Sequence, residues 1–207
     1  MLAAFCLLVI GALLLNPGFW QELQQKAVPW PVAGASICVL ALMWQTDAAV
    51  LEHLSIHFLA LTSLVLMFGL RLSALLFVLV IALQWLVSNA PAADLLWTLV
   101  CGWLVLTLNY TVYLLCFYYL QRHLFVYLFV AVFLNAALGL VVYMLMQAWI
   151  HADQYSSEQL YQGYLIFIPL AALPEALLNG MAMTLLVIYK PHWVYTFYQR
   201  IYLSGKS

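Results

Sequence analysis

The densest group of polar side chains in the sequence lies at residues 47–57. His53 and His57 are four residues apart, so on a helix both imidazoles would lie on one face. Two such imidazoles can coordinate a borderline divalent cation, and nearby acids would offset its charge. The pattern predicts a metal site formed by His57, His53, Glu52 and Asp47. The alternative is that Asp47, Glu52 and His53 are solvated in a loop while His57 makes a buried hydrogen bond.

A second polar outlier is Glu175, which follows Pro174 inside an apolar stretch, with Asn179 one helical turn further on. An ionisable side chain at mid-membrane depth costs about 2.5–3.5 kcal/mol on insertion scales, so it must face protein or a wet cavity. Proline also frees a backbone carbonyl and permits a local break in a helix. We expect Glu175 and Asn179 either to line a cavity for a transported substrate or to satisfy each other within the helix packing.

The motifs of common catalytic machinery are missing. The sequence has no phosphate-binding glycine loop with lysine, no glycine-flanked nucleophilic serine and no metalloprotease histidine pair. The chain is therefore not expected to be an enzyme or to hydrolyse ATP itself. Its cysteines lie in apolar stretches without metal-ligand spacing, so we expect small buried side chains rather than disulfides or a zinc site. They are Cys6, Cys38, Cys101 and Cys116.

The composition excludes a water-soluble protein. Hydrophobic residues make up 68% of the chain and charged residues 6%, whereas roughly a quarter of the residues in soluble domains are charged. Such a chain cannot cover its exterior with polar groups, so most of its surface must contact the lipid bilayer. A net charge of -1 without a run of basic residues also excludes nucleic acid as a partner.

The length fits about seven transmembrane helices of roughly 20 residues each, forming one all-α membrane domain over residues 1–207. The first two apolar stretches are short and need flanking aromatic rings at the headgroup level to reach full length. The first lacks the basic flank of a secretory signal, so we expect it to be retained; without it, about six spans remain. The predicted spans are Leu2–Leu15, Val32–Trp44, Leu54–Leu70, Leu72–Val87, Leu95–Leu120, Leu124–Ile150 and Tyr164–Tyr189.

The basic residues predict the orientation, because Lys and Arg in short loops stay on the cytoplasmic side. A cytoplasmic C-terminus places all six of them on that side: Lys26, Arg71, Arg122, Lys190, Arg200 and Lys206. The opposite side then receives the loops around Asp47 and Glu52, around Asp94, and from His151 to Glu158, which contain no Lys or Arg. This separation supports both the topology and the span count.

Three stretches of the chain resemble one protein family. From His57 to Arg71, a histidine opens a stretch of small and apolar residues that ends at Gly69 before a short turn. This segment resembles the CbiM-type permeases, which are the substrate-binding components of energy-coupling-factor transporters for cobalt and nickel. The segments 173–181 and 102–109 are similar to the glutamate-containing last helix and the central Gly and Asn stretch of that family. The resemblance covers about residues 52–191 and is stronger at its two ends.

The resemblance implies a permease of the bacterial cytoplasmic membrane that takes Co2+ or Ni2+ as its substrate and holds no permanent cofactor. It also implies a membrane coupling subunit and cytoplasmic ATPases as partners. In the cobalt and nickel members, an N-terminal Met-His and a histidine at the position of His57 hold the ion. This chain begins Met1-Leu2-Ala3, so only His57 carries over, and Asp47, Glu52 or His53 would replace the missing chelate.

The sequence also permits functions of classes other than transport. The chain could be a non-transporting membrane subunit that binds a partner protein or a small organic ligand in a cavity near Glu175. A haem-binding electron carrier is disfavoured, because bis-histidine ligation needs imidazoles at matching depth on facing helices, and His57 has no counterpart except His151.

Overall fold

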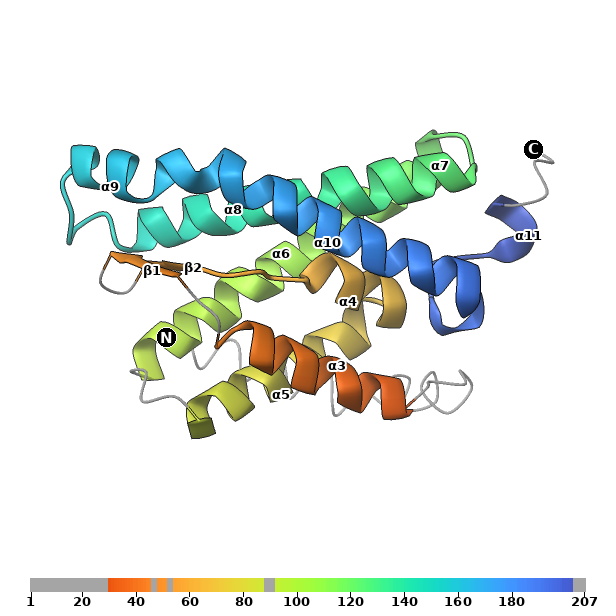
Figure 1. Cartoon of the computed structure of the whole chain (residues 1–207), viewed down its shortest axis with the longest axis horizontal. Coiled ribbons are helices and arrows are strands. Elements are labelled where there is room, and N and C mark those ends of the chain that lie inside the picture. Colours follow the sequence, from red (N-terminus) through yellow and green to blue (C-terminus); the bar gives the residue numbers. More distant parts are fainter. Residues whose placement is uncertain (1–29, 46–47, 52–53, 88–91, 203–207) are drawn as a thin grey trace.

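The computed structural model of the chain describes residues 30–45, 48–51, 54–87 and 92–202 (Figure 1). Its elements are almost all helical, which confirms the predicted all-α class. In chain order they are α3 (Trp30–Met43), β1 (Ala48–Leu51), β2 (Leu54–Ile56), α4 (Leu61–Phe68), α5 (Leu70–Val87), α6 (Ala92–Tyr119), α7 (Leu124–Val126), η1 (Tyr127–Leu134), α8 (Asn135–Ile150), α9 (Ser157–Gly163), η2 (Leu165–Phe167), α10 (Ile168–Tyr189), η3 (Pro191–Trp193) and α11 (Gln199–Tyr202).

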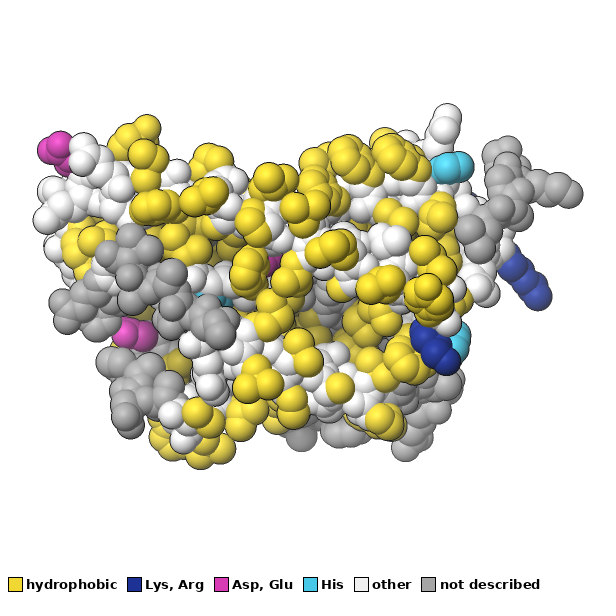
Figure 2. Space-filling view, viewed as in Figure 1, with side chains coloured by type: hydrophobic (Ala, Val, Ile, Leu, Met, Phe, Trp, Pro, Cys, Tyr) yellow, Lys and Arg dark blue, Asp and Glu magenta, His cyan; other side chains and the backbone are white. Residues whose placement is uncertain are grey.

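Within the described ranges, four helical segments are long and apolar enough to cross a membrane: Leu70–Val87, Ala93–Tyr119, Leu124–Ile150 and Ser157–Tyr189. The 28 residues of α6 alone extend for about 42 Å. Large apolar side chains also point outward, with 80% of Trp149 and 74% of Leu86 exposed, and they cover much of the surface in Figure 2. The protein is therefore membrane-embedded.

The long helices pack around a shared apolar core. α10 lies along α8 and η1, while α6 packs against α8, α5 and α4, and α3 packs on α5 (Figure 1). The π-helical stretch η1 lies between α7 and α8, so a wider turn interrupts one continuous helical segment. The buried apolar side chains of these elements form one cluster.

The predicted spans and the observed helices agree in most of the described chain. Leu72–Val87, Leu95–Leu120 and Leu124–Ile150 correspond to α5, to α6 and to the α7–η1–α8 segment. Tyr164–Tyr189 corresponds to η2 and α10, which begin one residue later, at Leu165. Val32–Trp44 corresponds to α3, which has 14 residues and is shorter than a full span. The stretch Leu2–Leu15 lies outside the described residues.

The prediction of a helical span over Leu54–Leu70 is wrong. β2 pairs antiparallel with β1, an extended stretch follows, and only the eight residues of α4 are helical before Gly69 interrupts the chain. Every residue of α4 is buried. Non-helical backbone at membrane depth is tolerated where protein satisfies its polar groups, so side chains from other helices must supply hydrogen bonds here.

The charged side chains separate toward the two ends of the bundle. Asp94 lies in the first turn of α6, and Asp153 and Glu158 lie around the start of α9, which we call the acidic end. Arg122 and Lys190 follow α6 and α10 at the other end, called the basic end. Figure 2 shows this division on one face of the molecule, with acidic side chains toward the left and Lys and Arg on the right.

Candidate functional site

His57 lies where the β-hairpin leads into the buried helix α4. The strand β2 ends at Ile56, and residues 57–60 are non-helical until α4 begins at Leu61. The chain runs here from the hairpin toward the middle of the bundle (Figure 1). His57 is therefore a half-buried side chain on an extended segment, and not a residue of a helix face as the sequence pattern predicted.

The carboxylate of Glu175 fixes the backbone just after His57. Its Oε2 accepts the backbone N–H of Leu59 at 3.0 Å, and its Oε1 accepts that of Ala60 at 2.8 Å. Glu175 is on α10, more than a hundred positions away in sequence, and only 1% of it is exposed. Both N–H groups precede the first turn of α4, where no intrahelical acceptor exists. Glu175 therefore acts as a capping residue supplied by another helix.

Asn179 completes this connection one turn along α10. Its Nδ2 donates to Oε1 of Glu175 at 2.8 Å, and its Oδ1 accepts the backbone N–H of Ser63 at 2.9 Å and the Ser63 hydroxyl at 2.7 Å. Asn179 is completely buried. Glu175 and Asn179 thus accept the hydrogen bonds of backbone N–H groups at the start of α4, and they are hydrogen-bonded to each other. The mutual hydrogen bond is what one of the two sequence-based interpretations expected. Direct contact of either side chain with a substrate stays a prediction.

The backbone at Ala60 has an uncommon conformation, with φ at 51° and ψ at 16° in the left-handed region. Residues other than glycine rarely adopt this conformation. Where they do, contacts with the surrounding structure hold them in it. The hydrogen bond from the Ala60 N–H to Glu175 is one such contact. The direction in which residues 57–59 approach α4 is therefore set by a strained residue that α10 holds in place.

A second set of amides fixes the side of α4. Asn109 of α6 donates through Nδ2 to the hydroxyl of Thr62 at 2.7 Å, and Asn135 of α8 donates to the backbone carbonyl of Asn109 at 2.9 Å. A Cβ on Gly139 would lie 2.8 Å from Oδ1 of Asn109, so the glycine leaves room for this amide. Asn109 and Asn135 thus form hydrogen bonds between helices.

The other end of α4 is held by the segment after α10. The backbone N–H groups of Tyr195 and Thr196 donate to the carbonyls of Met67 and Leu66 at 3.0 and 3.2 Å, and the Thr196 hydroxyl also donates to Leu66 at 2.8 Å. The hydroxyl of Tyr127 is 2.8 Å from that of Thr196. Both ends of α4 are therefore capped by residues far away in sequence.

Aromatic rings surround the imidazole of His57. The centroid of the Trp44 ring lies 4.6 Å from that of His57, and the ring of Tyr143 from α8 lies edge-on at 5.8 Å. Gln147, one turn along α8, donates to the Tyr143 hydroxyl at 2.9 Å. We call Trp44, His57, Tyr143 and Gln147 the His57 box. It combines the imidazole of His57, a group that can bind metal ions, with the flat rings of Trp44 and Tyr143.

The His57 box contains buried polar atoms that the described residues do not satisfy. Nε1 of Trp44 and Oε1 of Gln147 make no hydrogen bond to any described residue, and the residues are each 9% exposed. Buried polar atoms in proteins nearly always have a partner, either protein, water or ligand. A donor on Trp44 and an acceptor on Gln147 are thus available within the His57 box for a polar ligand.

The other predicted metal ligands cannot be placed. Asp47, Glu52 and His53 lie outside the described residues, so the structure does not test whether they approach His57. Among the residues that it describes, no three His, Cys, Asp or Glu side chains gather closely enough to hold a metal ion. The cysteines Cys38, Cys101 and Cys116 are free thiols; only Cys101 is fully buried, whereas Cys38 is exposed.

Sequence reasoning missed Trp44, Tyr143 and Gln147 as neighbours of His57. They come from α8 and from the residue that follows α3, and aromatic or amide residues in apolar stretches carry no spacing that marks a site. Asn179 and Glu175 were detectable because polar residues are rare at that depth. Comparisons of the chain with protein-family models, with curated proteins and with solved structures find no match.

Proposed function

We propose that the chain is the substrate-binding permease of an energy-coupling-factor-type transporter and that it takes up a divalent transition-metal cation such as Co2+ or Ni2+. The observation that carries the proposal is the anchoring of His57. His57 lies two residues before Leu59 and three before Ala60, and the backbone N–H groups of these two residues donate to the Glu175 carboxylate at 3.0 and 2.8 Å. A pre-positioned ligand loses little freedom when it binds an ion, and imidazole suits nickel and related ions.

One imidazole is not a complete metal site, so further ligands are required. In this proposal Asp47, Glu52 and His53 supply them, because they directly flank or connect the two strands in sequence. Release into the cytoplasm requires energy that the chain cannot supply, since it has no nucleotide-binding loop. A membrane coupling subunit with cytoplasmic ATPases fills that role, and the C-terminus lies on their side of the bacterial cytoplasmic membrane.

The test is isothermal titration of the purified chain with Ni2+, Co2+, Zn2+ and Cu2+. We expect saturable binding of at least one ion and a loss of affinity of about 10-fold or more in His57→Ala, as for other changes at metal sites. His192→Ala is the matched control, because His192 is exposed and lies at the basic end. No detectable binding of any of these ions, or unchanged affinity in His57→Ala, would contradict the proposal.

The second candidate is a non-transporting membrane subunit that binds a small organic ligand or a partner protein. The His57 box favours it, because Trp44 and Tyr143 offer aromatic faces and Gln147 an unsatisfied acceptor. Copurification separates the two candidates. An ATPase pair that stays bound to the chain supports transport, whereas a stable complex with an unrelated membrane enzyme supports the subunit.

A further inference from the structure

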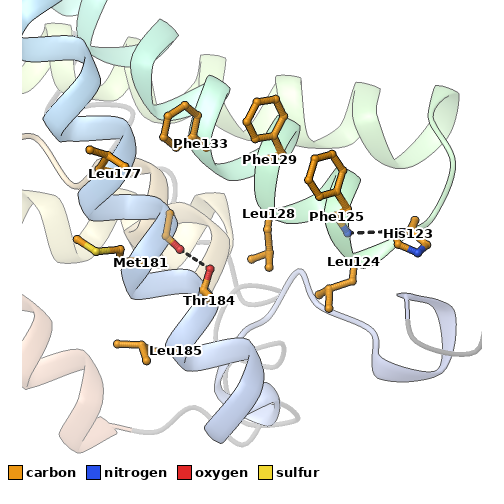
Figure 3. A pocket seen from close by; sticks show the side chains of 11 residues that line it. His123, Leu124, Phe125, Leu128, Phe129, Phe133, Leu177, Met181, Thr184 and Leu185 are labelled. Carbon is orange, nitrogen blue, oxygen red and sulfur yellow. Dashed lines mark hydrogen bonds between the residues drawn. The ribbon is translucent and has the colours of Figure 1, made fainter.

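An apolar groove of about 640 Å³ runs along the outer surface between α10 and the α7–η1 segment. One wall consists of Phe125, Phe129 and Phe133, whose rings stack in sequence with centroids 5.4 and 5.5 Å apart and nearly parallel planes. The opposite wall is formed by residues of α10 one turn apart, Leu177, Met181 and Leu185 (Figure 3). The groove is thus a trough between two helical walls, which diverge toward Leu185 and His123 in this view (Figure 3).

The floor of the groove is also apolar. Gly180 contributes no side chain there, and the Thr184 hydroxyl donates to the Gly180 carbonyl at 2.6 Å (Figure 3). This hydroxyl is therefore already satisfied by its own helix. A trough whose polar atoms are occupied in this way favours a hydrocarbon chain over water or a polar ligand.

The groove ends at the basic end of the protein. His123, whose ring accepts the backbone N–H of Phe125, lines this end, and Arg122 directly precedes it. Lys190 follows the last residue of α10, the helix that forms the other wall. The described acids outside the core lie at the acidic end, so no described carboxylate neutralises these cations.

We propose that the groove binds one acyl chain of an anionic phospholipid, with the phosphate group held near Arg122, His123 and Lys190. The apolar trough and the cationic end match the two parts of such a lipid. A transmembrane helix of a partner fits less well, because close helix packing needs small residues on the contact surface. The rims carry Phe125, Phe129 and Met181, of which 64%, 44% and 62% is exposed.

Native mass spectrometry of the full chain tests the proposal. The protein is exchanged into detergent with equal amounts of phosphatidylglycerol and phosphatidylcholine of identical acyl chains. Each cationic side chain near the phosphate is expected to raise the preference for phosphatidylglycerol about fivefold. The double variant R122Q/K190Q should lose this preference, whereas R71Q, which changes an exposed basic residue on α5, a helix that does not line the groove, should keep it. Equal retention of both lipids by the wild type overturns the proposal.

A second variant tests the trough itself. Gly180→Leu places a side chain on the floor and should reduce the retention of both lipids, while Gly34→Leu, at an α3 position where a Cβ meets nothing within 4 Å, should not. If Gly180→Leu does not fold, Met181→Trp narrows the groove from its exposed rim. Unchanged lipid retention in the folded variant overturns the proposal, as does a copurified protein whose helix crosslinks along the groove in place of lipid.

Discussion

Glu175 is the residue whose position in the sequence most demands an explanation. Each of its carboxylate oxygens accepts a backbone N–H from the segment that carries His57, and Asn179 donates to one of them. Two buried donors would lose their acceptor without it, and each unsatisfied group costs about 1–3 kcal/mol. The anchoring of the candidate ligand and the stability of α4 therefore depend on one side chain.

Replacement of Glu175 should lower both the stability of the protein and the metal affinity at His57. We expect Glu175→Ala to lower the free energy of unfolding by about 2–4 kcal/mol and Glu175→Gln to lower it less, because the amide keeps one acceptor oxygen. Unfolding in detergent measures the stability, and metal titration of the folded Gln variant measures the affinity at His57.

Glu158→Ala is the matched control for this series, since Glu158 is exposed and accepts a hydrogen bond of 3.1 Å from Nε2 of Gln162 on its own helix. It should change stability by no more than about 0.5 kcal/mol. Equal stability of Glu175→Ala and the wild type would refute the capping role.

Gly102 carries a second prediction about a single position. A Cβ there would clash with the ring of Phe77, which is buried on α5. Gly102→Ala should therefore cost about 1–3 kcal/mol through overpacking between α6 and α5. Thermal unfolding in detergent measures it. Gly34→Ala, with open space around its Cβ position, should instead be neutral or slightly stabilising, because alanine favours the helix.

Among the elements, α4 is the one whose form depends most on its surroundings. Its eight residues are too few for an independent helix. Glu175 and Asn179 cap its start, Asn109 binds its side, and Thr196 caps its end. This short helix thus connects α6, α10 and the C-terminal segment, and the segment that carries His57 leads into its start.

Gly69 is the position at which this arrangement is most easily disturbed. Its φ of 76° and ψ of 166° are accessible almost only to glycine, and an added Cβ would lie 2.9 Å from the Tyr195 ring. Gly69→Ala should destabilise the protein by about 1–3 kcal/mol and loosen the 195–196 segment. Hydrogen exchange at the Tyr195 and Thr196 amides measures the loosening. Unchanged protection of these amides would argue against coupling between the two segments.

At the scale of the whole molecule, the two ends differ in charge. Arg122 and Lys190 lie at one end, and Asp94, Asp153 and Glu158 at the other. Basic residues stay on the cytoplasmic side during insertion, so the basic end is expected to face the cytoplasm. The β-hairpin approaches the acidic end, as the contact of Leu51 with the Gly163 position shows. In this orientation the β-hairpin that leads to His57 would lie on the outer side of the membrane.

Topology reporters test the orientation. A green fluorescent protein fused to the C-terminus should fluoresce, and alkaline phosphatase fused there should be inactive, because each folds on only one side of the bacterial membrane. A cysteine at Gln154, in the exposed segment before α9, should react with a membrane-impermeant maleimide in intact cells. The reverse pattern would place the candidate site on the cytoplasmic side and contradict uptake from outside.

The sequence alone was sufficient to predict the structural class of the protein. The low charge content and the long apolar stretches predicted a membrane-embedded helical bundle, because lipid-facing helices need little else. The same scarcity made Glu175 and Asn179 conspicuous, since polar residues at that depth must have partners. The charges at the two ends could be assigned for the same reason.

Only the tertiary structure decided the form of Leu54–Leu70 and the surroundings of His57. Hydropathy cannot distinguish a continuous span from a strand, an extended turn and a short helix, because all of them bury apolar side chains. What permits the broken form is a set of hydrogen-bond acceptors on α10, more than a hundred positions away in sequence. Periodicity along one segment carries no information about partners supplied by another, so His57 could be singled out from the sequence but its aromatic box could not.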